Sequence, residues 1–146
     1  MNGCVFLDAG HGGLNPANEY TTAPAKMFRH RQGEFHGDGW FYEGVWNRRL
    51  SEKVASKLKR LGVQVVWLSH AYLDLSLQYR VDKANWYHRN FMEGILISNH
   101  ANASLSHRGR GFEVYTTRGE TGADPLAERH WNNVEELLGD RIAMRS

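Results

Sequence analysis

The sequence predicts an α/β fold: a mostly parallel sheet flanked by helices, within a single layered domain covering residues 1–146. Apolar runs alternate with segments of helical periodicity in the order strand, helix, strand, helix, strand, strand, helix. A length of 146 residues suits one compact domain. With 41% hydrophobic and 23% charged residues, the composition is that of a globular protein able to bury a core.

The first predicted strand spans residues 3–9, an apolar run that leads into a glycine-rich turn. Cys4 lies within this run and is the only cysteine, so we expect a buried apolar residue and no intramolecular disulfide. Residues 12–42 show no clear periodicity and are expected to form a long loop, which in a small domain is usually functional or mobile. Residues 44–61 carry apolar side chains at helical spacing, and Gly62 provides the C-terminal stop.

A second strand is predicted at residues 63–68, and a second helix from about residue 75 to 91. Asp74 is the predicted N-cap of this helix. The side chains predicted to face inward from it are Leu77, Val81, Ala84 and either Tyr87 or Trp86.

Residues 94–98 form the next predicted strand, which breaks at Asn99-His100. Residues 111–117 alternate enough to form a fourth strand. Asp124-Pro125 then begins a last helix, which runs to about Leu138 and has proline in its first turn.

The charge pattern favours ordinary solvated faces over a nucleic-acid surface. The formal net charge is +2 and is spread along the chain; Arg29 to Arg31 and Lys57 to Arg60 hold the densest basic clusters. A weakly basic surface would suit an acidic polymer such as a cell wall. No apolar stretch has the length of a membrane span, and the N-terminus lacks the pattern of a signal peptide. We therefore expect cytoplasmic synthesis and no membrane insertion.

Two of the eight histidines stand out by their position. His11 and His100 each follow the end of a predicted strand, and in such sheets ligands bind beyond the carboxyl ends of the strands. Glu43 begins a helix, where the helix dipole favours a carboxylate. Two imidazoles and a carboxylate around an open position form a hydrolytic zinc site. Such a metal lowers the pKa of its bound water and polarises a carbonyl.

Three motifs extend this pattern, and they occur in family order. Asp8-Ala9-Gly10-His11-Gly12-Gly13, Glu43 at a helix start, and Ser98-Asn99-His100-Ala101-Asn102-Ala103 resemble the motifs of the N-acetylmuramoyl-L-alanine amidases. Supporting matches are Asn47, Leu50, Leu61-Gly62-Val63, Arg80, Ala84-Asn85 and Gly111-Phe112-Glu113-Val114-Tyr115. The resemblance covers almost the whole chain. The segment that contains Tyr20-Thr21-Thr22-Ala23-Pro24 and then Phe41-Tyr42-Glu43-Gly44-Val45 with Asn47-Arg48 resembles phage-encoded or prophage-encoded members, which act as endolysins in bacteriophage lysis.

The resemblance implies hydrolysis of the amide between N-acetylmuramic acid and L-alanine in peptidoglycan, after release of the protein to the cell wall or periplasm. It makes His11, Glu43 and His100 ligands of Zn²⁺. Asp8 is expected to have a structural or supporting role. Asn102 and Arg80 are candidate substrate-binding residues, although a structural role comes first for both.

The catalytic base is the point at which the chain departs from the family. Members carry a general-base glutamate on a last strand after the final helix, so the resemblance places this base beyond Ser146. Glu113 is the candidate within the chain, whereas Glu135 and Glu136 are interpreted as solvated helix carboxylates. Three explanations stay open: the chain is a piece of a longer protein, another residue is the base, or catalysis is impaired. The last would make the protein a zinc-containing module that binds peptidoglycan. A zinc peptidase or deacylase acting on another amide is a further alternative.

Overall fold

The computed structural model describes residues 3–29, 38–102, 111–139 and 144–145. It divides into two compact units, Met1–Ala101 and Asn102–Ser146.

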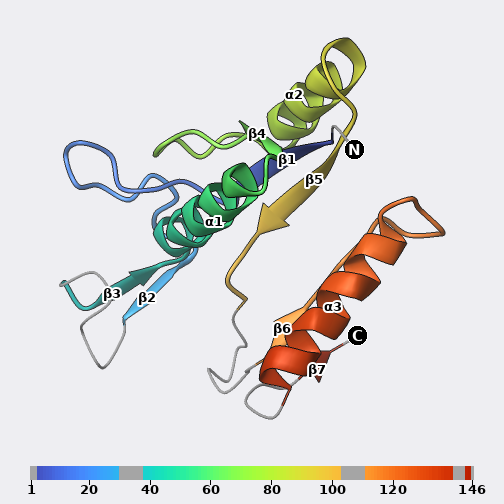
Figure 1. The fold of residues 1–146 in the computed structure, drawn as a ribbon. Helices are drawn as coiled ribbons and strands as arrows, with labels where there is room; N and C mark the ends of the chain where they lie inside the picture. Colours follow the sequence, from blue (N-terminus) through green and yellow to red (C-terminus); the bar gives the residue numbers. More distant parts are fainter. Residues whose placement is uncertain (1–2, 30–37, 103–110, 140–143, 146) are drawn as a thin grey trace. The chain divides into compact units, whose positions relative to one another are not determined.

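The first unit is built on a three-stranded parallel sheet with β1 (Cys4–Ala9) at its centre (Figure 1). β4 (Gln64–Trp67) and β5 (Gly94–Asn99) pair with β1 on either side, both in parallel. Every residue of β1 is buried, which explains its nearly continuous apolar sequence. Because the three strands run in the same direction, their carboxyl ends lie at one edge of the sheet.

One helix packs against each face of this sheet. Val5 and Leu7 of β1 point toward α1 (Glu43–Arg60), where they form an apolar core with Ala55. Cys4 and Phe6 point to the other face and pack with residues of α2 (Leu77–Asn90). The alternation of side chains along a strand produces these two separate cores. The predicted α/β fold, with a parallel sheet flanked by helices, is therefore confirmed.

The start of α2 differs from the prediction. Ser76 is the N-cap, and its hydroxyl accepts a hydrogen bond of 3.1 Å from the Tyr79 amide. The carboxylate of Asp74, the predicted cap, instead accepts hydrogen bonds from Thr22 and Arg80. Both Asp74 and Ser76 are common N-cap residue types, so the residue type could not decide between them. The prediction was wrong because Asp74 binds Thr22 and Arg80 instead of the start of the helix.

The prediction for the inward face of α2 was right for Ala84 and Tyr87 and wrong for Leu77 and Val81. Leu77 is 74% exposed and Val81 44% exposed, whereas Arg80 and Ala84 are buried. Trp86 is exposed, and Tyr87 packs against the core. Arg80 forms an ion pair with Asp8 of the central strand. This ion pair turns the Arg80 side of α2 toward the sheet. The apolar periodicity of the sequence does not predict such a polar contact.

The segment between β1 and α1 contains a small hairpin that the sequence did not predict. β2 (Met27–Arg29) and β3 (Trp40–Tyr42) pair antiparallel, with Phe28 opposite Phe41. Strands of three residues are too short to show a period of two. Residues 30–37 of the predicted loop lie outside the described residues.

The second unit contains β6 (Phe112–Glu113), α3 (Asp124–Leu138) and β7 (Met144–Arg145). β6 and β7 pair in parallel, and the ring of Phe112 lies 6.2 Å from that of Trp131. The last helix has the predicted bounds, but the strand predicted at residues 111–117 is only two residues long. Across the described ranges, no helix is long and apolar enough to cross a membrane.

Candidate metal centre

The structure brings together the three residues predicted to bind a metal. His11 follows β1, Glu43 is the first residue of α1, and His100 follows β5. His11 Nε2 lies 3.3 Å and His100 Nδ1 3.1 Å from the same atom, Glu43 Oε1. The two imidazole rings are 4.9 Å apart and nearly perpendicular. One ligand atom from each residue lies within 4.8 Å of the other two, so the cluster has the size of a single-ion site.

The donor set fits a divalent metal ion such as zinc. Two imidazole nitrogens and one carboxylate oxygen are the ligands of many hydrolytic zinc sites. His11 Nε2 is buried and makes no hydrogen bond within the described residues, although Glu43 Oε1 lies 3.3 Å away. A buried nitrogen without a partner costs free energy, and coordination of a metal would remove that cost.

The protonation states of the site favour metal binding. Burial is the main reason that the pKa of His11 lies below its usual value, although the charge of Glu43 acts in the opposite direction. For Glu43, burial raises the pKa. The hydrogen bond with His100 and the nearby positive groups outweigh this, so that the pKa of Glu43 is lowered overall. At neutral pH these shifts favour a neutral imidazole at His11 and an ionised carboxylate at Glu43, the forms that bind metals.

A buried polar stripe on α1 holds both strand ends in place. Asn47 is 0% exposed; its Nδ2 donates to the Gly10 carbonyl at 3.0 Å, and its Oδ1 accepts from the Ala101 amide at 2.9 Å. One turn further, Ser51 Oγ accepts a hydrogen bond of 2.9 Å from Asn99. Glu43, Asn47 and Ser51 are spaced by four residues and therefore share one helix face. Asn47 thus joins the segments that carry the two histidines.

Arg48 fixes the backbone around His11. Its guanidinium donates hydrogen bonds to the carbonyls of His11, Gly12, Gly44, His70 and Ala71. His11 has a φ of 64°, a left-handed conformation that is uncommon for a residue other than glycine. A rigid planar fork of donors suits this task better than a single ammonium would.

The sequence analysis did not predict the roles of Asn47, Ser51 and Arg48. For Asn47 and Ser51 the sequence held an indication, because with Glu43 they form a polar row that recurs every four positions beside the apolar row of Leu50 and Val54. A row of polar side chains that begins at the predicted ligand Glu43 indicates a helix face that forms hydrogen bonds with the ends of the neighbouring strands.

Asp8 and Arg80 form a separate buried network. Arg80 is 4% exposed; its Nη1 lies 3.2 Å from Asp8 Oδ2 and its Nη2 lies 3.0 Å from Asp74 Oδ1. Ser98 Oγ also donates to Asp8 at 2.6 Å. The Arg80 guanidinium thus braces α2 against the sheet. Its role as a substrate-binding residue stays a prediction.

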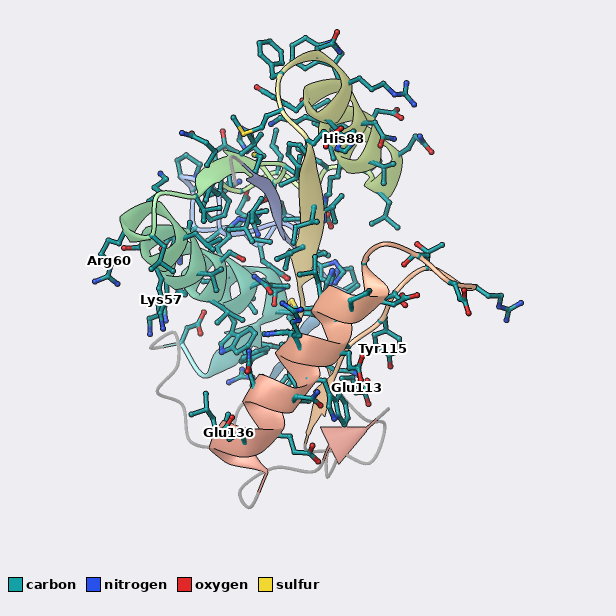
Figure 2. The ribbon with its side chains drawn as sticks, turned by 45° about the vertical axis from the view of Figure 1, so that its right-hand side comes forward. Lys57, Arg60, His88, Glu113, Tyr115 and Glu136 are labelled. Carbon is teal, nitrogen blue, oxygen red and sulfur yellow. The ribbon has the colours of Figure 1, made fainter. Side chains whose placement is uncertain are left out.

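The other predicted site residues belong to the second unit. Asn102 Nδ2 donates to Glu113 Oε2 at 2.7 Å, and the Tyr115 hydroxyl donates to the same oxygen at 2.6 Å. Glu113 and Tyr115 are labelled in Figure 2. These donors orient the carboxylate of Glu113. Glu135 and Glu136 are exposed on α3, the environment expected of solvated helix carboxylates.

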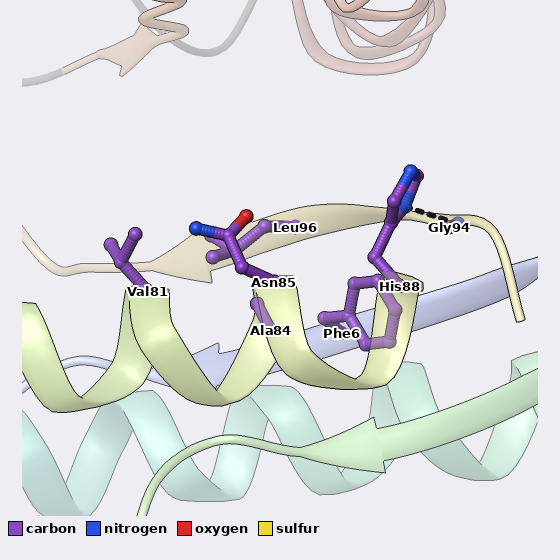
Figure 3. A pocket seen from close by; sticks show the side chains of 7 residues that line it. All are labelled: Phe6, Val81, Ala84, Asn85, His88, Gly94 and Leu96. Atoms are coloured by element: carbon purple, nitrogen blue, oxygen red, sulfur yellow. Dashed lines mark hydrogen bonds between the residues drawn. The ribbon is translucent and has the colours of Figure 1, made fainter. Parts of the chain in front are cut away.

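A cavity of about 270 Å³ lies elsewhere in the first unit, between α2 and β5 (Figure 3). Its lining is mostly apolar, and His88 Nδ1 accepts a hydrogen bond from the Gly94 amide. Gly94 is at the amino end of β5, whereas His100 follows its carboxyl end. None of the residues that line this cavity belongs to the metal cluster.

Comparison with known proteins identifies the family. Residues 5–144 match the family model described as N-acetylmuramoyl-L-alanine amidase. The chain belongs to this family. Among solved structures, it is similar to the N-acetylmuramoyl-L-alanine amidase AmiC2 of Nostoc punctiforme, with 25% identity and a TM-score of 0.70. That match covers 99% of this chain and 67% of AmiC2.

A second solved structure is the catalytic domain of CwlV, an N-acetylmuramoyl-L-alanine amidase from Bacillus (Paenibacillus) polymyxa var. colistinus. It is 24% identical with a TM-score of 0.67, and the match covers 98% of this chain and 67% of CwlV. At this identity the likeness concerns the fold alone. No curated protein sequence matches the chain. The prediction of the amidase family from the ordered motifs is confirmed.

Proposed function

We propose that this amidase-family chain is a zinc-dependent hydrolase of the amide bond between N-acetylmuramic acid and L-alanine in peptidoglycan. The observation that carries the proposal is the convergence of His11, Glu43 and His100, one from each of three elements, on a single cluster. The activity would serve lysis or remodelling of the cell wall. The phage-like motifs between residues 20 and 48 favour a role in bacteriophage lysis.

In this proposal the chain holds the metal with two neutral imidazoles and one carboxylate. His11 and Glu43 already favour the required protonation states, and Asn47 and Arg48 keep the ligand-bearing segments in place. When bound, zinc lowers the pKa of its water toward neutrality and polarises the scissile carbonyl. Asn47 holds the backbone next to both histidines, so we expect its loss to weaken zinc binding by displacing those ligands.

Proton transfer requires a base, for which Glu113 is the candidate within this chain. Two donors, Asn102 and Tyr115, bind one oxygen of its carboxylate and so fix the orientation of the side chain. If Glu113 is the base, Glu113→Gln reduces the turnover number by about 10²- to 10⁴-fold while zinc content is unchanged. Asn102 would contact substrate only indirectly, through the carboxylate that it orients.

The proposal is tested by incubating purified, zinc-loaded protein with purified sacculi. We expect release of stem peptides that begin with a free L-alanine, and we expect His11→Ala to abolish both this release and stoichiometric zinc binding. His88→Ala is the matched control, because His88 is exposed on α2 and lies outside the metal cluster.

The outcomes separate the alternatives. Protein that contains zinc and binds sacculi without releasing peptide is the peptidoglycan-binding module. Release of fragments cut at another amide identifies a different zinc hydrolase. Wild-type protein that binds no zinc at all excludes the proposed centre.

A further inference from the structure

The first turn of α1 is capped by a residue that lies outside the helix. Tyr42, the N-cap, forms no cap hydrogen bond with its side chain. The Glu43 amide donates to the Lys26 carbonyl at 3.0 Å. The next amide, that of Gly44, donates to the hydroxyl of the buried Tyr20 at 3.0 Å, and this hydroxyl donates to the Lys26 carbonyl at 3.2 Å. Because the first amides of a helix have no partner within it, the Tyr20 hydroxyl fixes the turn that carries the Glu43 carboxylate.

A second hydroxyl holds the turn that carries His11. The Gly12 amide donates to Thr22 Oγ1 at 2.8 Å, and the same hydroxyl donates to Asp74 Oδ2 at 2.7 Å. Gly12 is buried, so its amide needs a partner within the protein. A hydroxyl that both accepts and donates has a fixed orientation, so Thr22 fixes the backbone directly after His11.

The two hydroxyls have the same relation to the metal cluster. Each accepts a hydrogen bond from the glycine that directly follows a predicted ligand. The two glycines also lie against each other, since a Cβ on Gly44 would overlap the carbonyl oxygen of Gly12. Residues 20–22 therefore hold the place where the two ligand-bearing segments meet. This is a role for the motif that the sequence analysis related to phage-encoded members.

We propose that Tyr20 and Thr22 are positioning residues, whose hydroxyls hold the two ligand-bearing segments at the separation that one metal ion requires. The inference rests on the proposed function, in which His11 and Glu43 bind zinc. Ligands that are held in place by the surrounding hydrogen bonds lose less freedom when a metal binds, so the site binds it more tightly. In this role both residues act through the backbone next to the ligands and not on the metal itself.

The test measures the zinc affinity of the full-length protein by competition with a chromophoric chelator. Tyr20→Phe and Thr22→Val each remove one hydroxyl and keep nearly the same side-chain shape. We expect each substitution to weaken zinc binding by about tenfold, the effect of leaving one buried amide without its partner.

Two neighbouring substitutions make the same chemical changes without removing a partner of those amides. Tyr42→Phe removes a hydroxyl from a tyrosine that is 8% exposed, like Tyr20, but this hydroxyl donates to Asp38. Thr21→Val removes a hydroxyl that donates to the Tyr72 carbonyl. We expect both controls to keep the zinc affinity of the wild type.

Thermal unfolding separates positioning from a purely structural role. Zinc raises the thermal midpoint by an amount that depends on its affinity for the folded protein. A purely structural hydroxyl, when lost, lowers the midpoint equally in zinc and in EDTA. We expect Tyr20→Phe and Thr22→Val also to reduce the difference between the two midpoints, because their folded forms bind zinc more weakly.

Wild-type zinc affinity in both Tyr20→Phe and Thr22→Val overturns the inference, and so does an equal loss of affinity in the two controls. Either result leaves the amidase proposal standing if the wild type releases stem peptides from sacculi. Conversely, zinc binding that is weakened only in Tyr20→Phe and Thr22→Val supports the positioning role even if the wild type releases no peptide, a result that would contradict hydrolysis alone.

Discussion

At the scale of single residues, the site depends on buried polar side chains whose partners come from different elements. Glu43 has both histidines within 3.3 Å of one carboxylate oxygen. Asn47 donates a hydrogen bond to the Gly10 carbonyl on one side of the site and accepts one from the Ala101 amide on the other. A buried amide satisfied in this way fixes geometry, because any shift of either segment would leave a polar group unpaired.

The first prediction concerns Asn47→Ala. The substitution leaves the Gly10 carbonyl and the Ala101 amide without their partner, and each buried group left unpaired costs about 1–3 kcal/mol. We therefore expect the free energy of unfolding to fall by about 2–4 kcal/mol in urea denaturation, and the zinc affinity to fall as well. Asn85→Ala makes the same chemical change at an exposed position of α2 and should cost less than about 0.5 kcal/mol. Equal effects of the two substitutions would contradict the bridging role.

At the scale of elements, the sequence predicts best what depends on apolar periodicity. α1 and α3 begin and end close to the predicted positions, because a capping or proline signature coincides with a helical pattern. The inward face of α2 could not be predicted in the same way. Its rotation depends on the partner of Arg80, a residue 72 positions away along the chain. A contact of that kind leaves no local periodicity.

The second prediction concerns the contact between α1 and the turn after β1. A Cβ on Gly44 would overlap the backbone carbonyl oxygen of Gly12. Glycine to alanine within a helix normally stabilises by about 1 kcal/mol. Here we expect Gly44→Ala to destabilise by about 1–3 kcal/mol, because backbone must move to relieve the overlap. Gly3→Ala, where a Cβ meets nothing within 4 Å, is the control for thermal denaturation. A Gly44→Ala variant as stable as the wild type would exclude this tight contact.

At the scale of the whole molecule, β1 connects the two apolar cores of the first unit and the metal cluster. Its alternate side chains enter two different cores, and the turn after it carries His11. The sequence predicts His11 and His100 as strand-end residues because the carboxyl ends of parallel strands meet at one edge. The position of Glu43 at a helix start gives a weaker prediction, since a carboxylate there is common, and the family motif strengthens it. The hydrogen bonds of Arg48 could not be predicted from the sequence. All of its acceptors are backbone carbonyls, which every residue type carries.

The last prediction concerns the ion pair that joins Arg80 of α2 to Asp8 of β1. Arg80→Met leaves the carboxylate of Asp8, which is 3% exposed, buried without its counter-ion. Breaking one side of a buried ion pair costs about 3–5 kcal/mol, so we expect a loss of that size in urea denaturation. Adding Asp8→Val should restore most of it. The apolar pair removes the uncompensated charge that Arg80→Met leaves on Asp8. Arg89→Met, at an exposed position of the same helix, should change stability by less than about 0.5 kcal/mol. If the double variant is no more stable than Arg80→Met alone, the pair does not act as a coupled unit.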